Sequence, residues 1–268
     1  MSGGSNMNYK KNSLGDRMKT YEGVTRNYLI RRTPVIIRVD GKAFHSFTKG
    51  FQEPFDMVLM ESMWETAKYL CANVQGCKLA YVQSDEISLL LTDYEGIGTQ
   101  AWFENNILKI VSISASMATL SFNNNFENNY YKYILNNEVI DSTIKQSMKY
   151  SEKINTALFD SRVFNLPKEE VCNYFIWRQQ DATRNAIQMV GQANFSHKQL
   201  QNKNCNKIQE MLFQEKGINF NNLPTYQKRG ICIIKEYYQK DEVQRSRWIE
   251  DKDIPIFTQD RNYIEKFL

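Results

Sequence analysis

The segment from residue 78 to residue 92 constrains the fold most, because it contains two apolar strands, 78–82 and 87–92, joined by a short polar turn. Such a connection makes the strands antiparallel neighbours. A β-branched run at 35–39 predicts a further, buried strand. Between them, apolar residues recur at helical spacing after Pro54 and up to Gly76, which predicts a helix. The chain therefore begins as strand, helix, strand, strand.

The middle of the chain extends this pattern. We expect a helix over residues 99–122, an Asn-rich loop over 123–133, a polar helix over 136–151 and a strand over 159–166. The complete order, strand-helix-strand-strand-helix-strand, is that of a ferredoxin-like split unit, an antiparallel sheet with helices on one face. Polymerase palms have this arrangement, which is an analogy of fold alone. The expected class is α+β.

The last hundred residues predict a helical and β extension of this unit. Helices are expected at 169–199 and 207–215, a strand at 232–238, and a hairpin or loop in the charged tail from Lys240. We divide the chain into three parts: an N-terminal segment at 1–28, partly flexible; a palm-like catalytic domain at 29–167; and a C-terminal region at 168–268 that packs on the palm.

Composition excludes several classes of protein. No apolar run is long enough to span a bilayer. The five cysteines are odd in number and show no C-x-x-C spacing, which favours reduced thiols, and two histidines are too few for a His-rich zinc site. Residues 1–12 lack the apolar core of a secretory signal and are poor in arginine. We expect a cytoplasmic protein, with a mitochondrial location less favoured.

Two acidic positions at strand ends carry the chemistry. Asp40 ends the first strand, and Gly41 allows a sharp turn after it. In a split unit the turn that holds Asp85 lies near that strand end, so the two carboxylates approach each other and repel unless a cation intervenes. Mg²⁺ favours one or two carboxylates together with phosphate oxygens. Glu86 would face the other way on a regular strand.

The loop after Asp40 is a second candidate feature. The backbone N–H groups of residues 41–45 are expected to form a concave nest for phosphate oxygens. Each feature also has a simpler interpretation, since an Asp-Gly pair is most often a turn and Ser-Asp-Glu a solvated hairpin. His45 alone is more often a packing residue than a catalyst. Lys109 could reach a triphosphate, although helical lysines usually point to solvent.

Six segments, taken together, resemble the tRNA-histidine guanylyltransferase superfamily, whose members add nucleotides in the 3′-to-5′ direction. They are I-R-V-D-G-K-A-F-H-S-F at 37–47, Y-V-Q-S-D-E-I-S at 81–88, F-D-S-R-V at 159–163, W-R-Q-Q-D at 177–181, and E-M-L-F at 210–213 with G-I-N-F-N at 217–221. The resemblance covers about residues 29–235, and its first two motifs are specific.

The resemblance implies a palm that binds two Mg²⁺ ions per active site and uses ATP and other NTPs. It implies that Asp40, the Gly41 carbonyl and Asp85 bind the metal, and that Asp40, Asp85 and Glu86 are catalytic. The implied nucleotide-binding residues are Asp40, Gly41, Lys42, Ala43, Phe44, His45, Ser84, Asp85 and Lys109. The family is usually a tetramer, so a homotetramer, a dimer of dimers, is expected.

Departures from the eukaryotic pattern point to one branch. Thr183 stands where those enzymes carry a histidine after W-R-Q-x-D, and Ile208-Gln209 replaces a Lys-Asn pair. Two other basic positions of those enzymes are Glu53 and Asn106 here. The chain thus resembles the guanylyltransferase-like branch, whose members repair truncated tRNA 5′ ends and use the opposite strand as the template. The implied chemistry is ATP-dependent 5′ adenylylation followed by attack of an incoming nucleotide's 3′-hydroxyl.

Alternatives remain open from the sequence. They are addition of G at position −1 of tRNA-histidine, a palm-fold nucleotide cyclase or synthase that does not use RNA, and a non-catalytic tRNA-binding module. A net charge of +4 permits an RNA partner without requiring one. The candidate tRNA contacts are Lys198, Lys203, Lys207, Lys228 and Arg229.

Overall fold

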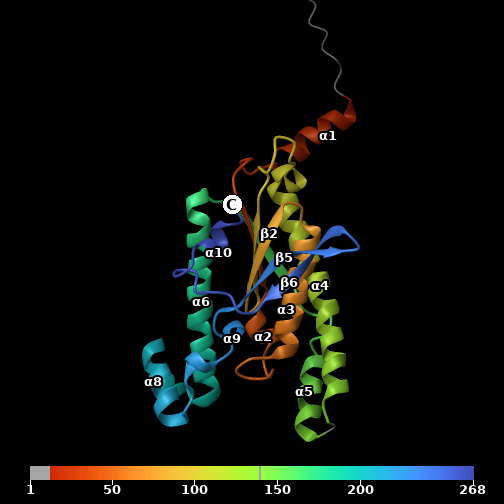
Figure 1. Ribbon diagram of the computed structural model, residues 1–268. Coiled ribbons are helices and arrows are strands. Elements are labelled where there is room, and N and C mark those ends of the chain that lie inside the picture. The colour runs from red at the N-terminus through yellow and green to blue at the C-terminus, as the bar shows by residue number, and fades with distance from the viewer. Residues whose placement is uncertain (1–12, 139) are drawn as a thin grey trace, which may run out of the picture.

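The computed structural model describes residues 13–138 and 140–268 (Figure 1). The sequence predicts that residues 1–12 are flexible, and these residues lie outside the described ranges. The strands are β1 (Val35–Gly41), β2 (Cys77–Gln83), β3 (Glu86–Leu91), β4 (Phe159–Asn165), β5 (Ile231–Lys240) and β6 (Val243–Asp251). The helices are α1 (Leu14–Gly23), α2 (Phe44–Phe47), α3 (Met57–Asn73), α4 (Ile107–Asn136), α5 (Asp141–Ser151), α6 (Lys168–Asn194), α7 (His197–Leu200), α8 (Cys205–Lys216), α9 (Thr225–Arg229) and α10 (Asn262–Glu265).

The strands form one antiparallel sheet in the order β4-β1-β3-β2-β5-β6. The α+β class and the antiparallel sheet are therefore confirmed. The charged tail from Lys240 forms the second strand of a hairpin with β5, one of the two outcomes expected for it. None of the helices in the described ranges has both the length and the apolar character that crossing a bilayer requires.

Helices cover both faces of the sheet (Figure 1). Val35, Ile37 and Val39 point to one face and join a core with α3 and α4. Ile36 points to the other face and packs with residues of α6 and of the C-terminal segment. The alternation follows the two-residue period of a strand. It determines which side chains of β1 face α6, and this matters for the site below.

Helix α4 differs most from the expectation. It begins after Asn106, whose side chain accepts from the N–H of Lys109, so residues 99–106 are a loop and a 3-10 turn. It continues through 123–133, where a loop is expected from the Asn-rich composition. Asn123 exchanges hydrogen bonds with the backbone of Ala157, and Asn129 donates to Ser62. These buried contacts make the asparagines part of the core and override their low helix propensity.

Two helix boundaries are also corrected. Helix α3 begins at Met57 rather than at Pro54, because the Asp56 side chain caps it by accepting from the N–H of Leu59. The helix expected over 169–199 ends at Asn194. A new cap at Ser196 then starts the short α7, with Ser196 and Gln199 forming a reciprocal capping box.

Candidate active site

The sheet brings the ends of β1 and β3 together. Asp40 pairs in register with Glu86 on β3, and the N–H of Gly41 donates to the Asp85 carbonyl at 3.1 Å. Burial raises the pKa of the Asp85 carboxyl, and the neighbouring carboxylates of Asp40 and Glu86 raise it further. Hydrogen bonds to its own backbone and to Ser84 partly oppose this shift. The two acidic positions predicted from the sequence are therefore electrostatic neighbours.

Gly41 is required by packing after the strand end. A Cβ at this position would lie 2.2 Å from a ring carbon of Phe44. Phe44 is itself held by contacts with the rings of Phe47, Phe122 and Phe159. The missing side chain thus lets an aromatic cluster anchor the loop that follows Asp40.

Replacing Gly41 with alanine is expected to destabilise the protein by about 1–3 kcal/mol, because the added methyl group overpacks the Phe44 site. Urea unfolding would measure the loss. The control is Gly98→Ala, since no atom lies within 4 Å of a Cβ there. Equal stability of the two variants would contradict this account of the glycine.

The phosphate nest expected over residues 41–45 is narrower than predicted. Gly41 and Lys42 donate their N–H groups to the carbonyls of Asp85 and Leu158, the latter at 2.8 Å. Ala43 adopts a left-handed conformation, with φ 55° and ψ 36°, directly before the right-handed α2. Such a change of hand points successive N–H groups into one concavity. In the described part of the chain no hydrogen bond uses the N–H groups at 43–45, so these three remain for an anion.

A cavity of about 440 Å³ adjoins this loop. It is lined by the predicted residues Phe44, His45, Ser84 and Asp85. Its remaining walls come from the loop before α3 and from α6, and include Thr48, Lys49, Gln52, Glu53, Asp56, Met189 and Gln192. Sequence reasoning missed the α6 residues. The only available signal was Met189 on the apolar stripe, and its side chain is partly exposed instead of buried in the core.

Five predicted nucleotide-binding residues do not line this cavity: Asp40, Gly41, Lys42, Ala43 and Lys109. Lys42 and Ala43, which directly precede the cavity-lining Phe44 in the sequence, are exposed. Lys109 is exposed in the first turn of α4. That helix packs on the face of the sheet opposite to α6, whereas Asp40 follows Ile36 and Arg38 toward α6. Contact between Lys109 and a triphosphate stays a prediction.

Glu86 is held in a buried ionic network. Its side chain is 5% exposed, and Arg178 of α6 donates two hydrogen bonds to it, both 2.7 Å long. Arg38 lies 2.9 Å from the same carboxylate and donates to Asp40 at 2.8 Å. Glu86 thus faces α6, as Leu90 on the same strand does, and it does not line the cavity beside Asp85. Its support of activity stays a prediction.

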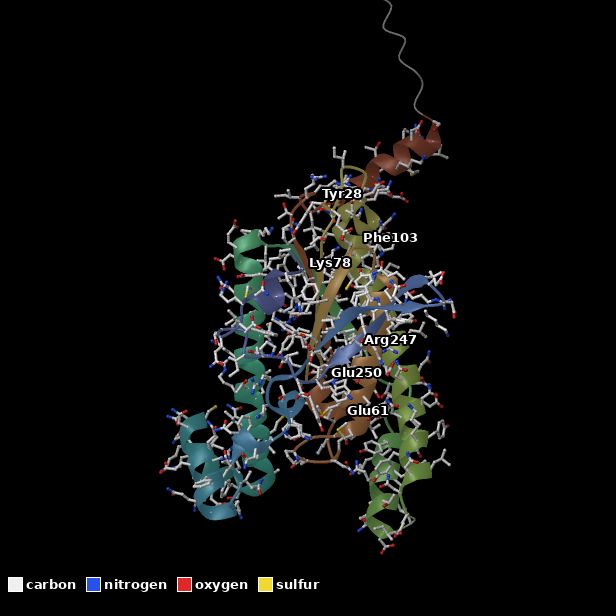
Figure 2. The ribbon with its side chains drawn as sticks, viewed as in Figure 1. Tyr28, Glu61, Lys78, Phe103, Arg247 and Glu250 are labelled. Carbon is white, nitrogen blue, oxygen red and sulfur yellow. The ribbon has the colours of Figure 1, made fainter. Side chains whose placement is uncertain are left out.

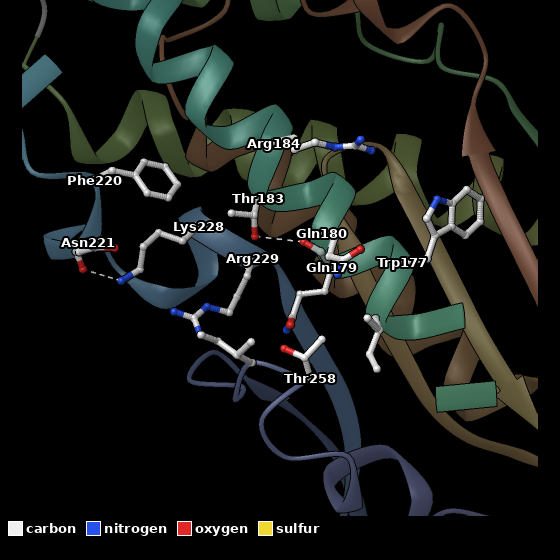
Figure 3. Close-up of a pocket in the computed structure, with 12 residues that line it drawn as sticks. Trp177, Gln179, Gln180, Thr183, Arg184, Phe220, Asn221, Lys228, Arg229 and Thr258 are labelled. Atoms are coloured by element: carbon white, nitrogen blue, oxygen red, sulfur yellow. Dashed lines mark hydrogen bonds between the residues drawn. The ribbon is translucent and has the colours of Figure 1, made fainter. Parts of the chain in front are cut away.

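The candidate tRNA contacts fall at different places. Lys228 and Arg229 line a second cavity of about 540 Å³, together with Trp177, Thr183 and Arg184 of α6 (Figure 3). Lys228 donates to the carbonyl of Asn221 at 2.6 Å, and burial and the adjacent Arg229 lower its pKa.

The other three lysines lie earlier in the chain, in or beside α7 and α8. Lys203 lines a third cavity of about 420 Å³, which shares Glu53 and Gln192 with the cavity beside Asp85. Lys198 and Lys207 are exposed, and Lys207 pairs with Glu210 at 2.7 Å. None of these positions by itself identifies a tRNA contact.

The donor set at the strand ends suits magnesium. Among residues 13–138 and 140–268, no three His, Cys, Asp or Glu side chains surround a common point. A site of two carboxylates and one backbone carbonyl agrees with that, because Mg²⁺ retains water and takes further ligands from substrate phosphates. Burial and the negative charge of Asp40 raise the pKa of the Asp85 carboxyl, which supplies the electrostatic reason for a cation there.

Comparison with known proteins identifies the family. The family model described as tRNAHis guanylyltransferase matches residues 15–167, more than half of the chain. The chain belongs to the tRNA(His) guanylyltransferase family. A tRNA(His) guanylyltransferase from Debaryomyces hansenii is 31% identical over 79% of this chain and 77% of its own length. Family membership makes the chain a nucleotidyltransferase that acts on tRNA, as the resemblance in its motifs implies.

Solved structures agree with this family. A bacterial tRNA(His) guanylyltransferase (Thg1)-like protein in complex with ATP is 51% identical, with a TM-score of 0.80 over 95% of this chain and 98% of that chain. A bacterial Thg1-like protein in complex with GTP is 48% identical, with a TM-score of 0.75 over 94% and 97% of the two chains. The tRNA(His) guanylyltransferase of Saccharomyces cerevisiae, at 22% identity and a TM-score of 0.61, shares the fold.

Proposed function

We propose that this family member extends the 5′ end of tRNA in the 3′-to-5′ direction, with each nucleotide chosen by pairing with the opposite strand. The observation that carries the proposal is that Asp40 lies close enough to Asp85 to raise its pKa, while Asp85 lines a cavity of about 440 Å³. The place of Thr183, where eukaryotic guanylyltransferases carry a histidine, favours 5′-end repair over a reaction confined to tRNA-histidine.

The fold supports the interpretation of residues 29–167 as a polymerase-type palm. The strand order β4-β1-β3-β2, with α3 and α4 on one face, is that of the split β-α-β-β-α-β unit. The carboxylates lie where β1 ends and where β2 turns into β3. Residues 168–268 form the proposed C-terminal region, whose α6 supplies one wall of the cavity.

The cavity beside Asp85 is the proposed nucleotide site. Relatives with about half of their residues identical have been solved with ATP and with GTP, which supports NTP binding here. Asp40, the Gly41 carbonyl and Asp85 would hold two Mg²⁺ ions, which when bound neutralise charge on phosphate oxygens and lower the pKa of an attacking hydroxyl. The N–H groups at 43–45 would orient the phosphates.

The proposed reaction has two steps. The 5′-monophosphate of the tRNA attacks ATP, and the 5′ end becomes adenylylated with loss of pyrophosphate. The 3′-hydroxyl of the incoming nucleotide then attacks this activated end, and AMP leaves. A 5′-triphosphate end would enter at the second step. Phosphoryl transfer depends mainly on positioning and charge, so the reaction needs little acid-base chemistry from the basic side chains that line the cavity, His45 and Lys49.

The second cavity is the proposed contact for tRNA on α6 and α9. It combines an exposed indole, Trp177, with the cationic side chains Arg184, Lys228 and Arg229 (Figure 3). Aromatic faces stack on unpaired bases, and cations neutralise phosphates. The lysines at 198, 203 and 207 would extend this contact along α7 and α8.

A 5′-truncated, 5′-phosphorylated tRNA tests the proposal. Incubated with ATP, all four NTPs and Mg²⁺, it is expected to gain the nucleotide that its acceptor strand specifies, which length analysis and sequencing would detect. Templates that differ only at that acceptor base serve as matched controls. Incorporation of the same base on every template would contradict templated repair.

Addition of G at position −1 of tRNA-histidine is the second candidate, because the matching family model is described by that activity. Guanosine added only to tRNA-histidine, whatever the opposite base, would favour it. NTP turnover without any RNA would instead indicate a cyclase or synthase. Binding of tRNA that is indifferent to Mg²⁺ and NTP would indicate a binding module.

The resemblance also leads us to propose a homotetramer, arranged as a dimer of dimers, and a cytoplasmic location. Light scattering of the purified protein would give its mass in solution.

A further inference from the structure

A continuous chain of ion pairs links Asp40 to the surface of α6. From Asp40 it passes through Arg38 and Glu86 to Arg178, with contacts of 2.8, 2.9 and 2.7 Å. Arg178 also contacts Asp181 at 2.9 Å, and Asp181 contacts the exposed Arg184 at 2.6 Å. The chain alternates in charge at every step. It joins the end of β1 to a helix more than a hundred residues later in the sequence.

The centre of this chain of ion pairs is almost completely buried. The side chains of Arg178 and Glu86 are 6% and 5% exposed, and a buried charge of this kind is costly unless it is paired. Arg178 satisfies both oxygens of Glu86 with a bidentate contact. Both arginines lie near the same oxygen, Oε2, but only Arg178 forms hydrogen bonds to Glu86, because Nε of Arg38 lies 2.9 Å from that oxygen without hydrogen-bond geometry. The side-chain hydrogen bond of Arg38 goes to Asp40 instead.

We propose that Arg178 and Asp181 are positioning residues for Asp40, acting through Glu86 and Arg38. The inference rests on the proposed function, in which Asp40 binds a divalent cation. Arg38 occupies Oδ2 of Asp40 and thereby leaves Oδ1 for the cation. Without Arg178, Glu86 has no other bidentate partner and attracts Arg38 away from Asp40. Asp181 orients Arg178 from the other side.

Binding of Mn²⁺ to the full chain, without RNA or nucleotide, tests the proposal. Electron paramagnetic resonance of free Mn²⁺ gives the Kd, and Arg178→Gln is expected to raise it about tenfold, as partners of metal ligands commonly do. Asp181→Asn is expected to raise it by less, and Asp181→Glu to restore it. The matched control is Glu265→Gln, which removes an exposed pair on α10 with Arg261.

Activity provides a second readout. The Mg²⁺ concentration for half-maximal nucleotide addition is expected to rise in Arg178→Gln. Excess Mg²⁺ is expected to restore most of the rate. A role in folding alone would lower the melting temperature without moving either metal dependence. If Arg178→Gln does not fold, Asp181→Asn decides the question, because Asp181 lies partly exposed on the helix surface and its asparagine keeps the same shape.

Two outcomes overturn the inference in distinguishable ways. If Asp40→Ala weakens Mn²⁺ binding but Arg178→Gln and Asp181→Asn bind like the wild type, Asp40 binds the cation without help from α6. If Asp40→Ala also binds Mn²⁺ like the wild type, the metal assignment of the proposed function fails, and the positioning role fails with it.

Discussion

Replacing Asp85 with asparagine is expected to reduce nucleotide addition about a thousandfold, equivalent to about 4 kcal/mol of lost transition-state stabilisation. Asparagine keeps the shape of the side chain but removes the negative charge that would hold a divalent cation. The variant should still fold, because Asp85 lies in a two-residue turn. Burial and the negative charge of Asp40 also disfavour the ionised form of Asp85, so a neutral side chain is tolerated there. Extension of a 5′-truncated tRNA in Mg²⁺ measures the rate, and circular dichroism checks the fold.

The control for this variant is another carboxylate at the same edge of the sheet. Asp160 pairs with Asp40 across β1 and β4, is exposed, and contacts only Arg162 at 3.7 Å among the ion pairs of the described residues. Asp160→Asn should retain nearly full activity. A folded Asp85→Asn variant with near-normal nucleotide addition would show that Asp85 does not hold a catalytic cation.

Replacing Glu86 with alanine is expected to lower the free energy of unfolding by about 3–5 kcal/mol, the usual cost of removing one partner of a buried ion pair. Arg178 would lose two hydrogen bonds of 2.7 Å and remain buried without its main counter-ion. The change would also release Arg38, so activity should fall in parallel. Urea unfolding, with the two-state slope compared between variants, measures the loss.

Exposed Asp160 again provides the comparison, because Asp160→Ala removes a carboxylate from the same face and is expected to change stability by no more than about 0.5 kcal/mol. Glu86→Ala with the stability of the wild type would mean that the network contributes little to the fold. A loss of activity in that stable variant would return Glu86 to a direct catalytic role.

The local sequence predicted much of the sheet and its acidic positions. β-branched and apolar runs predicted β1, β2 and β3 close to their observed bounds, because strand periodicity and a two-residue turn are local properties. The α+β class followed from the order of the elements. The family resemblance, whose specific motifs lie at 37–47 and 81–88, is confirmed by the comparisons.

Helix α4 shows where local reasoning failed. Its Asn-rich half is helical because Asn123, Phe126 and Asn129 are buried against partners distant in sequence. Asparagine has low intrinsic helix propensity, and only the packed structure reveals the compensating contacts. The predicted start of α3 was wrong for a related reason. Asp56 caps the helix, and its side chain is held by a hydrogen bond from Tyr150, which is distant in the sequence.

The sequence by itself determined the strands, the carboxylates at their ends and the family, because each depends on residue type and short spacing. Only the tertiary structure decided that α6 lies over the face that bears Asp40, that Met189 and Gln192 close the cavity, and that Arg178 neutralises Glu86. These contacts join residues separated by about a hundred positions or more. Their partners are selected by the pairing of strands and the burial of charge, which no short segment of the chain encodes.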